Sequence, residues 1–204
     1  MASRAMSSKA KASDVHALVL AAGQSRRFGA DKRLARLADG RTVLRASLVN
    51  ALEAFDRVSV VIREEDDLAT LDLPAAVEPI RTARAARGMG ASLADGVMAI
   101  RQYPCKAFAI LLGDMPWIPV MLMKQLAGQA EADRILLPVH GNRTGHPVIF
   151  GHAFANALTR LDGDQGARAV LAEHGDRCRR VEVGEPGILR DVDHPEDVQN
   201  VRPD

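Results

Sequence analysis

Aromatic residues, cysteines and long apolar runs are all scarce in this 204-residue chain. One Trp, one Tyr and five Phe offer too few stacking surfaces for a protein built to bind single-stranded nucleic acid. The two cysteines, Cys105 and Cys178, are too few and too far apart for a disulfide framework or a zinc motif, so we expect free thiols in a reducing compartment. No run approaches the ~18 consecutive apolar residues of a membrane span.

The chain also lacks an excess of either charge. Its 27 basic and 26 acidic residues leave a formal net charge of +1. No global field draws such a chain to nucleic acid or to an anionic membrane, so we expect neither partner, and any anion site must be local. Residues 1–13 are small, polar and basic without the apolar core of a secretory signal. We expect them to form a disordered leader, with residues 14–204 as one domain in the cytoplasm.

What is present is an alternation of apolar runs and amphipathic patterns, in which Thr42 is the expected N-cap of the first helix. Strands that are apolar throughout and alternate with helices indicate a single-domain, three-layer α/β/α sandwich with a mostly parallel, Rossmann-like sheet. Ligands of such sheets bind beyond the carboxyl ends of the strands. This rule selects the residues after 22, after 112 and around 140–146. The predicted strands are 15–22, 57–62, 76–80, 107–112, 134–139, 146–150 and 179–183, and the predicted helices are 42–55, 91–101, 119–130, 153–161, 165–174 and one from 195.

The loop LAAGQSRRFGADK, which follows the first predicted strand, contains glycine and positive charge. Its glycines, Gly23 and Gly29, fit neither the G-x-G-x-x-G dinucleotide spacing nor the P-loop spacing G-x-x-x-x-G-K-[ST]. Gly23 lets the backbone turn tightly and approach a ligand, successive N–H groups can cradle phosphate oxygens, and Arg27 and Lys32 add charge. These features predict a polyphosphate site. The alternative is a strand-to-helix turn with solvated basic residues.

Carboxylates occupy two other positions of interest. Asp114 comes directly after the strand at 107–112, where it is either a magnesium ligand facing the basic loop or the start of a turn. Asp191 and Asp193, in LRDVDHPEDV, alternate and so face the same side of an extended segment. Asp193 is alternatively the cap of the final helix.

Several motifs together point to one family. The pattern L-A-A-G-x-S-x-R-x-G-x-x-K is matched position by position, and G-M-x-x-S-L, G-D-x-P, G-x-P-V-x-F and G-D-x-G-A-R have counterparts further along. The chain resembles the MobA-like nucleotidyltransferases over about residues 15–198, and within them the molybdopterin cytidylyltransferase branch. The resemblance implies the nucleotide-diphospho-sugar transferase fold.

The resemblance also implies which residues meet the nucleotide and the metal. Arg27, Lys32 and Asp114 are the expected catalytic residues, and Asp114 is expected to hold Mg²⁺ together with Asp191, which we favour, or Asp193. The residues expected to bind the nucleotide are Leu20, Ala21, Ala22, Gly23, Ser25, Arg27, Lys32, Gly90, Ser92 and Gly113.

Four further positions concern the other parts of the site. His146 and Arg168 are the expected acceptor contacts, with an ordinary loop histidine and a surface arginine as the alternatives. Ser92 is expected to cap its helix, and its loop is expected to meet the base or ribose, with an ordinary glycine-rich helix start as the alternative. His194 stands where the family motif has Thr, at a side chain that need not touch the metal.

The reaction implied by the resemblance is Mg²⁺-dependent transfer of CMP from CTP to the terminal phosphate of molybdopterin or its molybdenum form, with release of pyrophosphate. The L-A-A-G form of the loop goes with CTP in related enzymes, and L-A-G-G with GTP. A phosphate monoester is already an anionic nucleophile, so catalysis would rest on positioning and charge neutralisation. The alternatives are a GTP-using guanylyltransferase, a cytidylyltransferase for a sugar or isoprenoid phosphate, and a nucleotide-binding delivery chaperone. Transient contact with a client molybdoenzyme or its chaperone is also expected.

Overall fold

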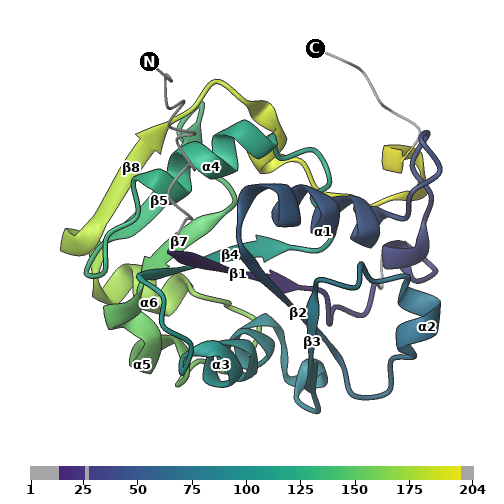
Figure 1. Ribbon diagram of the computed structural model, residues 1–204, viewed down its shortest axis with the longest axis horizontal. Coiled ribbons are helices and arrows are strands. Elements are labelled where there is room, and N and C mark those ends of the chain that lie inside the picture. The colour runs from purple at the N-terminus through teal and green to yellow at the C-terminus, as the bar shows by residue number, and fades with distance from the viewer. Residues whose placement is uncertain (1–13, 26–27, 199–204) are drawn as a thin grey trace, which may run out of the picture.

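The centre of the molecule is an eight-stranded sheet, seen in the computed structural model in Figure 1. The structure describes residues 14–25 and 28–198, so the predicted leader and Arg27 lie outside the described residues. The strand order is β3-β2-β1-β4-β7-β5-β6, with β8 beside β5. The strands are β1 (Val15–Leu20), β2 (Arg57–Arg63), β3 (Glu78–Thr82), β4 (Ala107–Leu112), β5 (Ile135–His140), β6 (Arg143–Thr144), β7 (Val148–Gly151) and β8 (Cys178–Glu182).

The pairing of these strands confirms a mostly parallel sheet. β1 is parallel to β2 and to β4, β2 is parallel to β3, and β5 is parallel to β8. Only β6 and β7 run antiparallel to their neighbours. Because β1, β2 and β4 are parallel, their carboxyl ends meet at one edge of the sheet, where ligands of such sheets bind.

Helices cover both faces of the sheet, which confirms the three-layer sandwich (Figure 1). Side chains of α1 and α4 pack on the face that Ala17 and Val19 of β1 present, whereas α3, α5 and α6 pack on the face of Leu18 and Leu20. No helix in the described part of the chain is long and apolar enough to cross a membrane. The helices are α1 (Val43–Ala54), α2 (Leu68–Leu71), α3 (Met89–Ile100), α4 (Val120–Gly128), α5 (Ala155–Leu158) and α6 (Arg168–Glu173), and the short 3₁₀ turns include η1 (Lys32–Leu34), η2 (Ala85–Arg87) and η6 (Pro195–Val198).

The structure can be compared with the two helix N-caps that the sequence predicts. Thr42 is the N-cap of α1, as predicted, because its hydroxyl accepts a hydrogen bond from the Arg45 N–H at 3.2 Å. The predicted cap at Ser92 is wrong. α3 begins at Met89, and Ser92 lies in its first turn, where its hydroxyl donates to the Gly88 carbonyl at 3.3 Å.

Three predicted segments are shorter in the structure, for identifiable reasons. The predicted strand at 146–150 pairs only from Val148, because the His146 N–H donates to the Ile188 carbonyl at 3.0 Å. The predicted helices at 153–161 and 165–174 shrink to α5 and α6. The segment between α5 and α6 is a loop, in which Gly163 and Gly166 have left-handed φ values of 69° and 56°.

Candidate active site

A cavity of about 420 Å³ lies beyond the carboxyl ends of β1 and β4, within the usual size range of small-molecule sites. Segments far apart in the sequence line it: the loop after β1, the start of η1, the approach to α3, the loop after β4, and single residues from two later loops. The predicted residues in its lining are Leu20, Ala21, Ala22, Gly23, Ser25, Lys32, Ser92, Gly113, Asp114 and Asp193.

Lys32 is the centre of the charge arrangement in this cavity. Its ammonium Nζ lies 2.6 Å from Asp114 Oδ2 and 3.4 Å from Asp193 Oδ1. Burial opposes the charge on Lys32, but the two carboxylates outweigh it, so the pKa of Lys32 is raised above its ordinary value. The ammonium therefore stays protonated throughout the physiological range.

Asp114 carries a polar atom that the described residues leave unsatisfied. Its Oδ1 is buried and has no hydrogen-bond partner within residues 14–25 and 28–198. Buried carboxylate oxygens are normally satisfied, and hard oxygen donors of this kind suit Mg²⁺. The described residues contain no group of three or more His, Cys, Asp or Glu side chains able to hold a metal ion by themselves. Such a site fits Mg²⁺, which typically takes one or two carboxylates and completes its shell with substrate phosphates and water.

Backbone hydrogen bonds hold the two carboxylate segments together. The Val192 N–H donates to the Asp114 carbonyl at 2.9 Å, which ties the extended segment before η6 to the loop after β4. The Asp197 carboxylate accepts hydrogen bonds from the N–H groups of Asp193 and His194 at 2.9 and 2.7 Å. Asp197 therefore acts as the local capping group, and the Asp193 side chain is turned to Lys32.

Asp191 lies outside the cavity lining but within electrostatic reach of it. Its side chain is exposed. Partial desolvation, and then the negative charges of Asp114 and Asp193, raise the pKa of Asp191. Of the two alternative second metal ligands, Asp193 is thus the one that lines the cavity and contacts Lys32.

The predicted acceptor contacts and Gly90 also lie outside the lining. His146 is half-buried with its Nδ1 3.2 Å from the Ile110 carbonyl oxygen, and burial lowers its pKa despite the nearby Asp114 and Asp191. Arg168 is exposed at the start of α6. The Gly90 N–H donates to the Gly163 carbonyl at 2.7 Å, so Gly90 packs against the loop before α6.

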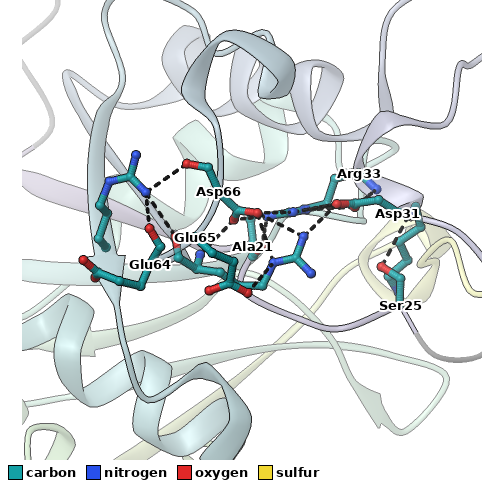
Figure 2. Close-up of polar contacts among 10 residues, drawn as sticks. Ala21, Ser25, Asp31, Arg33, Glu64, Glu65 and Asp66 are labelled. Carbon is teal, nitrogen blue, oxygen red and sulfur yellow. Dashed lines mark hydrogen bonds and ion pairs between the residues drawn. The ribbon is translucent and has the colours of Figure 1, made fainter.

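The loop after β1 turns at a different residue from the one expected. Gly23 does not have a left-handed φ, whereas Ser25 does, at 50°. The Ser25 hydroxyl accepts a hydrogen bond from the Lys32 N–H at 3.3 Å, which fixes the loop to η1 (Figure 2). A Cβ atom on Gly23 would have nothing within 4 Å. The glycine thus leaves open space in the cavity and is not required by the turn.

Arg33, the neighbour of Lys32, is the centre of a second charge cluster that sequence reasoning missed (Figure 2). All five N–H donors of its guanidinium are used, by Asp31, Asp66 and the Ala21 carbonyl, at 2.6 to 2.9 Å. Arg63 contacts the same two carboxylates at 2.7 and 3.0 Å. The cluster ties the loop after β1 to the loop after β2. The sequence carries no local signal for it, because Asp66 is 33 residues from Arg33.

Sequence reasoning also missed the lining contributed by Gly88, Met89 and Asp164. Gly88 has a φ of 115°, and a Cβ atom there would overlap the Asp164 carboxylate and the Gly163 backbone. The G-D-x-G-A-R motif was a usable signal, since Asp164 belongs to it. The prediction instead selected its arginine, Arg168, which is not part of the cavity lining.

Several solved structures share the fold of this chain. The Rv0371c protein of Mycobacterium tuberculosis H37Rv is 26% identical with a TM-score of 0.79, over 91% of this chain and 95% of that one. Its homologue from Mycobacterium sp. strain JC1 is 28% identical with a TM-score of 0.80, over 91% and 93%. A nucleotidyl transferase from Methanothermobacter thermautotrophicus shares the fold at 23% identity and a TM-score of 0.75, over 90% and 93%.

No curated protein sequence matches the chain. The family model described as the MobA-like NTP transferase domain matches residues 17–178, which include the loop after β1, the start of α3, the loop after β4 and the Asp164 loop. The chain therefore belongs to the family of MobA-like NTP transferase domains and is, by family, a nucleotidyltransferase.

Proposed function

We propose that this protein transfers CMP from CTP to the terminal phosphate of molybdopterin or its molybdenum form and releases pyrophosphate. The observation that carries the proposal is the triad of Lys32, Asp114 and Asp193 at the carboxyl ends of β1 and β4, in which one cation faces two carboxylates and one carboxylate oxygen lacks a described partner. A triphosphate would give Lys32 further negative charges to bind, and a divalent cation would give the Asp114 carboxylate a positive partner.

In this proposal Asp114 holds Mg²⁺ together with Asp193 or Asp191. When bound, the ion neutralises charge on the phosphates that are transferred and released. The unsatisfied Asp114 Oδ1 supports this role. The Rv0371c protein has been solved as a complex with manganese, which supports a divalent cation in a relative of the same fold.

The remaining steps belong to residues of the chain. The N–H groups around Gly23 and Ser25 receive phosphate oxygens, and Lys32 exchanges its carboxylate partners for the β- and γ-phosphates. Arg27 is proposed to offset charge on the same phosphates. The acceptor phosphate attacks the α-phosphorus directly, without a general base, which fits a described lining that contains no His or Cys. His146, next to the Asp114 end of the site, and Arg168 are the proposed acceptor contacts.

The choice of CTP rests on Ala22. In the L-A-G-G form of the loop this position is glycine, whereas here the Ala22 methyl group is part of the cavity lining. The methyl group leaves less room for a purine, which supports a pyrimidine nucleotide.

Pyrophosphate release from each of the four ribonucleotides, with and without molybdopterin, tests the proposal. We expect Mg²⁺-dependent release from CTP only when molybdopterin is present. Release from GTP and not from CTP would overturn the base, and release with a sugar phosphate in place of molybdopterin would overturn the acceptor. Tight CTP binding without release under any condition would instead favour a delivery chaperone.

A further inference from the structure

We propose that the Asp164 carboxylate accepts a hydrogen bond from the amino group of the cytosine base, an inference that rests on the proposed binding of CTP. Asp164 lines the same cavity as Lys32 and Asp114 but comes from the loop between α5 and α6. The assignment makes Asp164 a specificity-determining residue that separates CTP from UTP.

The two ends of the cavity differ in chemistry. Lys32 and the loop N–H groups form one end, which suits phosphates. Ala85, Ala86 and Met89 line the other end, near the start of α3, and present small or apolar side chains suited to the faces of a flat ring. Asp164 approaches this second end, since its carboxylate lies against Gly88.

The position of Asp164 is built into the backbone. The exposed Asp162 forms an ion pair with Arg87, two residues before the start of α3. The Gly163 carbonyl accepts a hydrogen bond from the Gly90 N–H at 2.7 Å. Gly88 leaves the space that the Asp164 carboxylate occupies, because any side chain there would overlap it. These contacts hold the loop against α3 and keep the carboxylate at the cavity.

The Asp164 carboxylate has no hydrogen bond or ion pair of its own within residues 14–25 and 28–198. Asp164 is exposed, so its carboxylate is accessible to a ligand. A carboxylate only accepts hydrogen bonds and repels phosphates, so the part of a nucleotide that suits it is one that carries donors. Ser92 offers no donor for a base acceptor at this end, since its hydroxyl donates to the Gly88 carbonyl. Cytosine presents an amino donor where uracil presents a carbonyl acceptor. A carboxylate at this place attracts the amino group of cytosine and repels the carbonyl oxygen of uracil.

Equilibrium binding of CTP, UTP and 2′-deoxy-CTP in the presence of Mg²⁺ tests the inference without any acceptor. The chains compared are the wild type, Asp164→Asn and a matched control, Asp133→Asn, which removes the same charge from an exposed loop outside the cavity lining. We expect the wild type to bind CTP about 10- to 100-fold more tightly than UTP, as a hydrogen bond to a charged group implies. Asp164→Asn should lose most of this ratio, since an amide can also donate to the uracil carbonyl, and Asp133→Asn should keep it.

Each other outcome is decisive. A wild type that binds UTP as tightly as CTP, or an Asp164→Asn chain with an unchanged ratio, overturns the role of Asp164 and leaves nucleotidyl transfer standing. An Asp164→Asn chain that weakens CTP but not 2′-deoxy-CTP places the carboxylate on the ribose and overturns the base contact. A wild type that binds none of the three nucleotides overturns the proposed function and the inference together.

Discussion

Lys32 and Arg33 are neighbours in the sequence, and each cation contacts two aspartates, but the two clusters differ in how complete they are. The Arg33 side chain is 5% exposed and every donor of its guanidinium has a partner. The Lys32 cluster is more open, with Lys32 17% and Asp193 33% exposed, and Asp114 Oδ1 has no described partner. A satisfied cluster rigidifies the loops that it joins. An incomplete one leaves charge available for a ligand.

The largest expected effect is a loss of stability, and it should differ between variants of the Arg33 cluster and of the Lys32 cluster. Arg33→Met should lower the free energy of unfolding by about 3 kcal/mol, because it leaves the buried Asp66 with fewer partners. Lys32→Met should cost only about 1 kcal/mol, because the side chains of its partners Asp114 and Asp193 are 18% and 33% exposed and can be partly hydrated. Urea denaturation of both variants measures the difference. Equal losses would show that the Lys32 cluster is as structural as its neighbour.

The second prediction concerns the catalytic role of the Lys32 cluster. Lys32→Met and Asp114→Asn should each reduce the rate of pyrophosphate release by about 10² to 10³, as loss of one electrostatic stabiliser typically does. Asp133→Asn, which removes an exposed carboxylate on another loop, is the matched control and should retain activity. Full activity in either cavity variant would remove that residue from the catalytic site.

The third prediction concerns a second buried polar atom, which has no described partner and does not line the cavity. His16 Nδ1 is the other such atom among the described residues. Burial, aided by Arg57 and opposed by Glu78, lowers the pKa of His16 from 6.5 to about 4. The folded state therefore holds His16 neutral. The stability that this neutral state contributes is complete above pH 6.5 and is lost as the pH falls to about 4.

Between these pH values the folded protein should lose about 3 kcal/mol through this one residue. His16→Gln does not titrate and keeps a donor for Ser59, whose hydroxyl lies 2.8 Å from His16 Nε2, so its unfolding free energy should fall less over the same range. His194→Gln, at an exposed histidine, is the control and should retain the wild-type slope. Identical slopes in the wild type and His16→Gln would contradict the prediction.

The smallest expected effect concerns the open space at Gly23. Gly23→Ala should leave the unfolding free energy unchanged, because the new methyl group meets no protein atom within 4 Å. It should weaken CTP binding about tenfold by displacing a phosphate from the loop N–H groups. Gly128→Ala, in equally open surroundings at the end of α4, should bind CTP normally. A Gly23→Ala chain with wild-type affinity would remove the phosphate from this part of the loop.

The parts of the fold that the sequence predicted well are those determined by neighbouring residues. The strand at 107–112 and the Thr42 cap follow from an apolar run and from one hydroxyl. The loops at the ends of β1 and β4 were also identified, because the topology of a parallel sheet brings strand ends together.

The parts that escaped prediction depend on contacts between distant segments. Arg33 meets Asp66, and Asp164 meets Gly88, only after the sheet has formed. The left-handed conformation of Ser25 has no sequence signal, since glycine is the residue usually expected there. His146 lies outside β7 because its N–H donates to the carbonyl of Ile188, 42 positions away, and no local sequence pattern predicts this hydrogen bond.

The contact between Lys32 and Asp193 spans 161 positions, and this separation orders events in time during synthesis. Translation from the amino end supplies Lys32 161 residues before Asp193, whereas the last strand, β8, ends at Glu182, only 11 residues before Asp193. Until then Lys32 has only Asp114 as a described partner in this cavity, and the Asp114 carbonyl lacks its hydrogen bond from Val192. The charge arrangement of the cavity is therefore completed only by the carboxyl-terminal segment, which is made after every strand of the described sheet.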